Sequence, residues 1–242
     1  MKHLFECMVR SLVTAGLIML IAFQSLCFGA GPGQRVNDAL SVVSQFTRIP
    51  EHNIPKGLLC NCHGLAIFPS VYKAGFVIGA SFGKGLFFMK DPATGRWYGP
   101  SFIMLAGGSI GWQIGIQATD LVLVIMNRRG AEAFMNDNLT LGGDLSVAAG
   151  PVGRRLQMGT DIALRAEAYS YSRNKGFFAG VSLDGTYIRQ DYKANELYYK
   201  RPLTPREILT GQVSTIAPQS AKRITNMLER LCTPKGGGYG QL

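Results

Sequence analysis

The sequence predicts an α+β protein: an antiparallel β-barrel or strongly curved β-sheet with flanking helices at both ends. Three observations lead to this class. Short apolar runs separated by glycine fill residues 65–190, and the chain holds 30 glycines among 242 residues, above the usual ~7%. Apolar residues recur at helical spacing both before and after this stretch. Hydrophobic residues make up 47% of the chain, which excludes a mainly disordered protein.

The first helix of the folded part is expected at residues 35–47. Its apolar residues share one helical face: Val36, Ala39, Leu40, Val43 and Phe46. Its polar face lacks the lysines and arginines of a helix that lies on an anionic membrane, so packing against the core is preferred over that alternative. A short second helix should begin at Ile54-Pro55, where proline suits the first turn, and end at Gly64.

The central β-rich body should consist of many short strands. The apolar runs that predict them are residues 65–68, 75–82, 86–89, 101–110, 121–126, 145–149, 163–170, 176–183 and 186–189. Residues 91–95 read as a turn, and Asp184-Gly185 reads as a two-residue hairpin loop. One or two helical turns are expected at 130–136.

Two sets of glycines spaced four residues apart interrupt this body: Gly75, Gly79 and Gly83, then Gly107, Gly111 and Gly115. In a membrane helix this spacing favours close helix packing, but neither run is a clean apolar segment of spanning length. In a strand the same spacing keeps the glycines on one face. The preferred interpretation is therefore that the sheet bends, or is covered closely, at these positions.

The C-terminal part should be helical again. Thr204-Pro205-Arg206-Glu207 forms a capping-box pattern with proline at the first helical position, and Gly211 should end that helix. An amphipathic helix is expected at 218–232 after Pro218. Residues 233–242 are glycine-rich and should form a flexible tail.

Residues 1–29 resemble an export signal peptide. The stretch from Ser11 to Gln34 is uncharged, and its densest apolar run, residues 12–23, is shorter than the ~20 residues of a spanning helix. The small residues Cys27 and Gly29 favour cleavage after Gly29. Two alternatives stay open: a lipoprotein anchored through Cys27, and an uncleaved anchor. We therefore expect an exported protein, periplasmic or attached to the cell envelope.

The positive charge belongs to the mature protein. Removing residues 1–29 lowers the formal net charge only from +10 to +9, because Lys2, Arg10 and Glu6 leave together. Such a balance favours anionic partners. Nucleic acid is disfavoured, because an exported protein rarely meets it and no recognition helix is visible. Anionic lipid or a membrane surface is the expected partner; a protein partner is left unspecified.

Three cysteines remain after the expected cleavage: Cys60, Cys62 and Cys232. Export would allow disulfides. A Cys60–Cys62 bridge would be strained, and a Cys62–Cys232 bridge is an open alternative. Cys60, Cys62 and neighbouring His63 supply only part of a zinc site, which needs four ligands. The preferred interpretation is that the cysteines pack as small apolar side chains, and no metal or cofactor is predicted.

The enzyme motifs in the chain fail on mechanism. Ser81 and Ser109 each stand in a Gly-x-Ser-x-Gly pattern, but a nucleophile elbow needs a histidine later in the chain, and none follows His63. Residues 79–85 lack the spacing and the Ser or Thr of a phosphate-binding loop. The sequence therefore predicts a protein that is not an enzyme.

The basic residues that flank the apolar runs are the candidate binding site. Paired or closely spaced cations lie at Arg128-Arg129, Arg154-Arg155, Arg173 with Lys175, and Lys200-Arg201. Such run ends can converge on one rim of a barrel. The lipid-binding residues predicted there are Arg154, Arg155, Arg173 and Lys175, with Trp97 as an interfacial aromatic anchor. The alternative is an ordinary solvated surface.

Several sequence blocks occur in the order found in the SYLF domain family. They are Gly-Leu-Ala-Ile-Phe-Pro at 64–69, Lys-Ala-Gly-Phe at 73–76, Trp-Tyr-Gly-Pro-Ser-Phe at 97–102, Gly-Trp-Gln-Ile-Gly at 111–115, Asp-Leu-Val-Leu-Val at 120–124, the glycine-rich block 141–154, and 171–181, ending near Asn195, Tyr198 and Tyr199. Together they cover the predicted domain at 35–210 and are specific, although no single block would be. The chain is thus identified as similar to this family.

The resemblance implies a β-rich, barrel-like body with flanking helices and no catalysis. The family is lipid-binding; its eukaryotic members bind phosphoinositides and some bind actin, and its bacterial members are often exported envelope proteins or lipoproteins. Here an export signal stands where eukaryotic members carry a basic amphipathic segment. Two functions follow as hypotheses: a non-enzymatic binder of anionic envelope lipid through a basic rim, or a structural or protein-interaction scaffold of the envelope.

Overall fold

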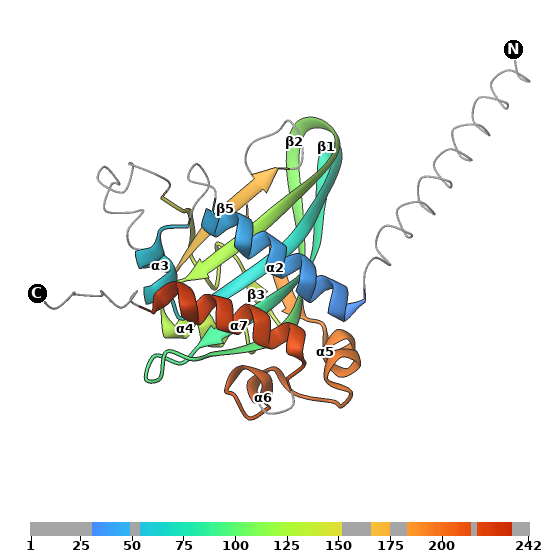
Figure 1. Ribbon diagram of the computed structural model, residues 1–242. Coiled ribbons are helices and arrows are strands. Elements are labelled where there is room, and N and C mark those ends of the chain that lie inside the picture. The colour runs from blue at the N-terminus through green and yellow to red at the C-terminus, as the bar shows by residue number, and fades with distance from the viewer. Residues whose placement is uncertain (1–30, 49–53, 152–165, 175–182, 214–216, 234–242) are drawn as a thin grey trace, which may run out of the picture. The chain divides into compact units, whose positions relative to one another are not determined.

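The computed structural model in Figure 1 describes residues 31–48, 54–151, 166–174, 183–213 and 217–233. Their helices are α2 (Pro32–Arg48), α3 (Lys56–Asn61), α4 (Arg128–Ala133), α5 (Tyr192–Tyr199), α6 (Pro205–Leu209) and α7 (Gln219–Cys232). Their strands are β1 (Gly64–Lys90), β2 (Trp97–Ile125), β3 (Leu139–Thr140), β4 (Val147–Ala149), β5 (Ala168–Asn174) and β6 (Tyr187–Gln190). The predicted α+β class, with a strongly curved sheet between helices, is confirmed.

Two long strands replace the many short ones that the sequence predicted. β1 has 27 residues and β2 has 29, and they pair antiparallel along their whole lengths. The expected breaks at the glycines do not occur, because glycine accepts extended backbone and its neighbours continue the ladder. The turn predicted at 91–95 is confirmed: the Asp91 amide donates to the Arg96 carbonyl at 2.9 Å, and Gly95 has a φ of +70°.

The β1–β2 ribbon doubles back on itself, as Figure 1 shows at its upper end. This brings the first half of β1 against its second half. A Cβ added to Gly85 would stand 2.7 Å from the Ile67 carbonyl oxygen and 2.4 Å from the Phe68 ring, and one added to Gly64 would stand 2.5 Å from the Phe87 ring. Only glycine allows the two halves to approach this closely.

The interpretation of the spaced glycines is supported at several positions. Gly83 lies under Val71, with an added Cβ 3.0 Å from a Val71 methyl, and one added to Gly107 would meet the Thr186 hydroxyl at 2.9 Å. The ladder between β1 and β2 shifts register where Gly75 faces Gly115. Other residues therefore pack closely over glycines of both sets, and the strand pairing is irregular near them, as expected where a sheet bends.

The remaining strands extend the free edge of β2. β5 pairs with residues 119–125 of β2, and β6 pairs with residues 103–106. The sheet order is β3-β6-β2-β5-β4, with β1 along the other edge of β2. β4 lies parallel to β5, so the sheet is not purely antiparallel. Because the two long strands each contribute two segments, the result is a curled half-barrel of eight strand segments.

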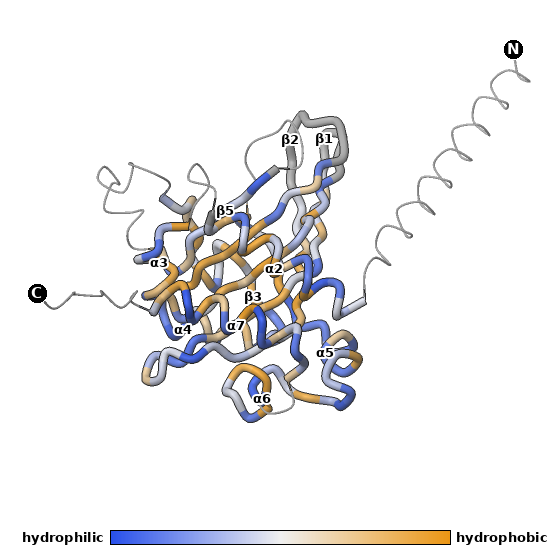
Figure 2. The backbone as a smooth tube through the Cα atoms, viewed as in Figure 1, coloured by the Kyte–Doolittle hydropathy of each residue, from blue (hydrophilic) through white to orange (hydrophobic). Residues whose placement is uncertain are grey.

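Both faces of the sheet are buried, and successive residues alternate between two cores. Leu65 and Ile67 belong to the core under the helices, whereas Ala66 and Phe68 belong to the core within the curl. β2 alternates in the same way at residues 121–125. This two-residue period follows from strand geometry, and Figure 2 shows hydrophobic residues throughout the sheet.

The flanking helices agree closely with prediction. α2 buries Val36, Ala39, Val43 and Phe46, so core packing holds rather than a membrane-surface role. α3 and α7 lie where short and amphipathic helices were expected. α7 contributes Ala221, Ile224 and Leu228 to the same core as the sheet. Among the described helices, none is long and apolar enough to cross a membrane.

The local signals near the C-terminus are confirmed in atomic detail. The Thr204 hydroxyl accepts from the Glu207 amide at 3.2 Å, and the Glu207 carboxylate accepts from the Thr204 amide at 2.8 Å, which completes the capping box. Gly211 follows α6 with a φ of +83°. The Asp184-Gly185 turn also forms, with the Thr186 amide donating to the Leu183 carbonyl at 3.0 Å.

The disulfide joins Cys60 to Cys232, with 5.2 Å between their Cα atoms. The alternative of a Cys62–Cys232 bridge is therefore wrong. Cys62 is 3% exposed and faces the core, where its thiol donates to the Leu59 carbonyl. Burial raises the pKa of Cys62 to about 12. Of the three cysteines, Cys62 alone packs as a small apolar side chain, as predicted. The disulfide joins α3 to the end of α7.

Candidate functional site

The structure describes one of the four predicted rim cations. Arg154, Arg155 and Lys175 lie outside the described residues, as do the signal peptide with Cys27 and most of the tail. Arg173 lies half-buried near the end of β5, where the pairing register places it opposite Asp120 of β2. Directly opposed residues on antiparallel strands are close neighbours. Asp120 itself is buried and accepts from the Ser70 amide at 3.1 Å.

Trp97 does not form an exposed anchor, and that expectation is wrong. It is 4% exposed and belongs to the core under the helices. Its amide donates to the Glu229 carboxylate of α7 at 3.2 Å, so α7 covers the start of β2. Among the described residues, the buried Nε1 of Trp97 has no hydrogen-bond partner. The neighbouring Tyr98 is half-buried beneath Gly211.

The two serine motifs lie inside strands. Ser81 of β1 pairs with Gly107, and its hydroxyl donates to the Gly107 carbonyl at 3.2 Å. Ser109 of β2 pairs with Gly79. A nucleophile elbow requires a sharp turn between a strand and a helix, so neither serine stands in that geometry. Within the described residues, no group of three His, Cys, Asp or Glu side chains could hold a metal ion.

Helix α5 presents a basic surface that the sequence analysis did not identify as a site. The helix begins at Asp191, whose carboxylate accepts from the Ala194 amide at 3.1 Å and so caps it. One face buries residues that include Ala194, Asn195 and Tyr198 against the sheet. The opposite face is left to solvent.

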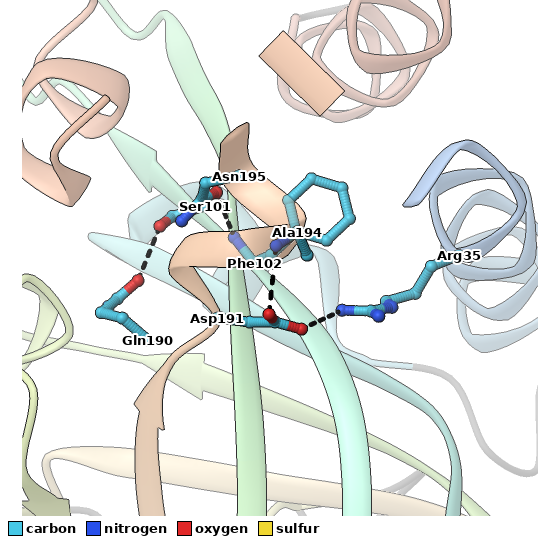
Figure 3. A network of polar contacts seen from close by, with 7 residues as sticks. All are labelled: Arg35, Ser101, Phe102, Gln190, Asp191, Ala194 and Asn195. Carbon is cyan, nitrogen blue, oxygen red and sulfur yellow. Dashed lines mark hydrogen bonds and ion pairs between the residues drawn. The ribbon is translucent and has the colours of Figure 1, made fainter. Parts of the chain in front are cut away.

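A polar network holds α5 in place, as Figure 3 shows. The Asn195 side-chain oxygen accepts from the Phe102 amide of β2 at 2.9 Å. Asp191 pairs with Arg35 of α2 at 3.1 Å, and both side chains are largely buried. Next to them, the Ser101 hydroxyl donates to Gln190 at 2.8 Å. Because α2, β2 and α5 are joined by these contacts, the outer face of α5 is a rigid platform.

That outer face combines an exposed leucine with cations. Leu197 is 51% exposed. Lys193 lies four residues before it and is its neighbour on the helix surface. Lys200 is exposed and follows the helix directly as its C-cap, with a φ of +61°. Arg201 follows at once and is exposed, while Glu196 is the acidic residue on this side. We call Lys193, Leu197, Lys200 and Arg201 the α5 surface.

A sequence signal for this surface was present in part. Lys200-Arg201 stood out as a basic pair, but Leu197 did not, because the amphipathic pattern of an eight-residue helix is short.

Tyr192, at the start of α5, is also 48% exposed. Its hydroxyl donates to Asp137 at 2.6 Å, and this hydrogen bond is the main reason that the pKa of Tyr192 rises to about 12. Tyr192 therefore stays neutral beside the cations.

Comparison with known proteins identifies the family. Residues 106–231, just over half of the chain, match the family model described as Ysc84, Las17-binding protein actin regulator. The chain belongs to this family. The SYLF resemblance drawn from the sequence blocks is thereby confirmed.

Curated relatives agree with this assignment. The chain is 37% identical over 200 residues to SH3 domain-containing YSC84-like protein 1 of Xenopus laevis, covering 79% of this chain and 58% of that protein. It is 36% identical over 209 residues to the human protein of that name, covering 84% and 60%. LAS seventeen-binding protein 3 of Saccharomyces cerevisiae is 34% identical over 195 residues, covering 77% and 41%. The chain thus spans about 40–60% of these relatives.

Proposed function

We propose that this protein is a non-enzymatic binder of anionic membrane surfaces, and that the α5 surface makes the contact. The observation that supports this most directly is Leu197, half-exposed on a rigid helix and flanked by Lys193, Lys200 and Arg201. An apolar side chain can enter the headgroup region while neighbouring cations bind lipid phosphates.

The expected strength follows from the charges. Each basic residue near an anionic membrane contributes about 1 kcal/mol, and Glu196 offsets about one of the three, which leaves roughly 2 kcal/mol. At ~1.4 kcal/mol per decade, this favours anionic over neutral vesicles by more than about tenfold. Screening acts over about 8 Å at physiological salt, so binding should weaken as salt rises.

The predicted rim is a second proposed contact. It comprises Arg154, Arg155, Arg173 and Lys175, whereas buried Trp97 takes no part in it. Figure 1 places the end of β5, which carries Arg173, far from α5 in the view. Separate variants can therefore test the two surfaces independently.

Vesicle co-flotation at low and high salt tests the proposal. Lys193→Glu with Arg201→Glu should reduce flotation with anionic vesicles at least tenfold, and Arg154→Glu with Arg173→Glu tests the rim. The matched control is Lys56→Glu with Arg96→Glu, which changes net charge equally at two exposed residues outside both surfaces. If the parent protein floats equally with neutral and anionic vesicles, lipid binding through charge is wrong. If the control variant loses as much flotation as the α5 variant, the loss reflects net charge and not the α5 surface.

A protein partner is the second candidate function, favoured by the family description as Las17-binding actin regulators. The α5 surface also suits an acidic protein surface. Co-sedimentation with actin filaments, using the same variants, distinguishes this function: binding to filaments without binding to vesicles would favour it. The absence of catalysis is tested with a fluorophosphonate probe, which should label neither Ser81 nor Ser109 in the folded protein.

We also propose export, with cleavage after Gly29 and a periplasmic or envelope location. The charge-free stretch around the apolar run at 12–23 supports this. N-terminal sequencing of the protein from the envelope fraction tests it, and an intact Met1 in the cytosol would contradict it. Fatty-acid labelling of the parent and of Cys27→Ala tests the lipoprotein alternative.

A further inference from the structure

A cleft of about 300 Å³ lies away from the α5 surface, between the β1–β2 turn, the start of α4 and the end of α6. Its polar wall contains His63, Lys90, Tyr98 and Arg128, which come from three separate parts of the chain. Met89 and Leu209 add apolar surface. Pockets of this volume lie at the lower end of the range for small-molecule sites.

The cleft has more hydrogen-bond donors than its own residues use. The Lys90 ammonium donates to the Cys60 carbonyl, which leaves it two further N–H groups. Arg128 donates through Nε to Glu132 at 2.7 Å, so its two terminal amino groups remain. Among the described residues, neither the His63 imidazole nor the Tyr98 hydroxyl has a hydrogen-bond partner.

Asp91 is the acidic residue in the wall, and its oxygens are occupied within its own turn. They accept from the Thr94 hydroxyl at 2.6 Å and the Ala93 amide at 2.9 Å. These bonds, the Thr94 bond first, lower the pKa of Asp91, so it is ionised. When Glu132, the partner of Arg128, is counted with Asp91, two carboxylates balance the two cations, so the cleft offers unused hydrogen-bond donors rather than a net positive charge.

We propose that this cleft binds a small organic molecule through its carboxylate group. The carboxylate accepts from the Arg128 amino groups, Lys90, His63 and Tyr98, while Met89 and Leu209 contact its apolar part. A carboxylate brings one negative charge beside ionised Asp91, whereas a phosphate dianion brings two, so repulsion within the cleft is smaller for the carboxylate. Carboxylates form strong, charge-assisted hydrogen bonds with guanidinium and ammonium groups.

The test uses hexanoate as the probe, hexanol as its neutral counterpart and inorganic phosphate as the competing anion. Titrations of the full chain follow the His63 imidazole by NMR, and His63→Gln identifies that signal among the three histidines. Hexanoate should shift the signal saturably, hexanol should not, and phosphate should bind more weakly than hexanoate. Arg128→Gln should weaken hexanoate binding about tenfold, which corresponds to the lower range for one charge-assisted hydrogen bond.

Arg129→Gln is the matched control, because Arg129 is the exposed neighbour and lies outside the cleft wall. It should leave hexanoate affinity unchanged. The Arg128 side chain is 71% exposed, so Arg128→Gln should fold normally. Lys193→Glu with Arg201→Glu should also bind hexanoate normally, which separates this site from the proposed membrane contact. Equal weakening in both arginine variants, equal binding of hexanol, or tighter binding of phosphate would each overturn the proposal.

Discussion

Removing one partner of the buried ion pair between Arg35 and Asp191 should destabilise the folded state by several kcal/mol. Their side chains are 9% and 13% exposed and lie 3.1 Å apart. The Arg35 guanidinium also stands 5.2 Å from the centre of the Phe102 ring. Asp191→Asn keeps an oxygen that can cap α5 but leaves the Arg35 charge buried without its partner. Breaking a buried pair from one side costs about 3–5 kcal/mol.

A second substitution separates the helix cap from the ion pair. Asp191→Ala removes both, so it should cost about 1 kcal/mol more than Asp191→Asn, the usual worth of a helix cap. Arg35→Met with Asp191→Asn removes both charges and should be more stable than Asp191→Asn alone. The difference measures the penalty of the uncompensated Arg35 charge.

Equilibrium unfolding in urea measures these differences, with thermal unfolding as a second readout. For a chain of this size a loss of 3–5 kcal/mol corresponds to a fall in Tm of roughly 6–20 °C. Arg128→Ala is the control, because the Arg128–Glu132 pair is 71% and 46% exposed and should contribute less than about 1 kcal/mol. If Asp191→Asn costs less than about 1 kcal/mol, the pair does not anchor α5, and the rigid-platform argument is refuted.

Four further predictions concern the cysteines and Trp97. Cys60→Ser with Cys232→Ser should lower the free energy of unfolding by up to about 5 kcal/mol, because the bridge closes a 172-residue separation; an unchanged urea midpoint would contradict this. Cys62, with its pKa raised to about 12, should resist a thiol reagent at pH 8 until the chain unfolds. Because its thiol ionises near 9 when unfolded, its contribution to stability should fall as pH rises from 9 towards 12, an effect that Cys62→Ala should abolish. Trp97→Phe should cost under ~2 kcal/mol by urea unfolding, because the lost packing is offset by removing an unpartnered buried donor; a larger loss would indicate that Nε1 is hydrogen-bonded.

The features predictable from sequence depend on interactions within a few residues. The capping box at Thr204, the turn at 91–95 and the amphipathic helix ending at Cys232 each depend on neighbours less than two or three turns away. Such signals keep their meaning wherever the segment lies in the fold. The α+β class with a curved sheet follows from these signals together, and the family follows from the order of the sequence blocks.

Tertiary structure alone decided what depends on residues far apart in the chain. Glycines that appeared to end strands continue two long ones, because the partner strand completes their hydrogen bonds. Cys60 rather than Cys62 reaches Cys232 because Cys62 turns into the core. Trp97 is buried because α7, more than a hundred residues later, packs over it. The α5 surface is exposed because the opposite face of α5 is held against β2 and α2. Whether a side chain contacts protein or solvent depends on how such distant segments pack together.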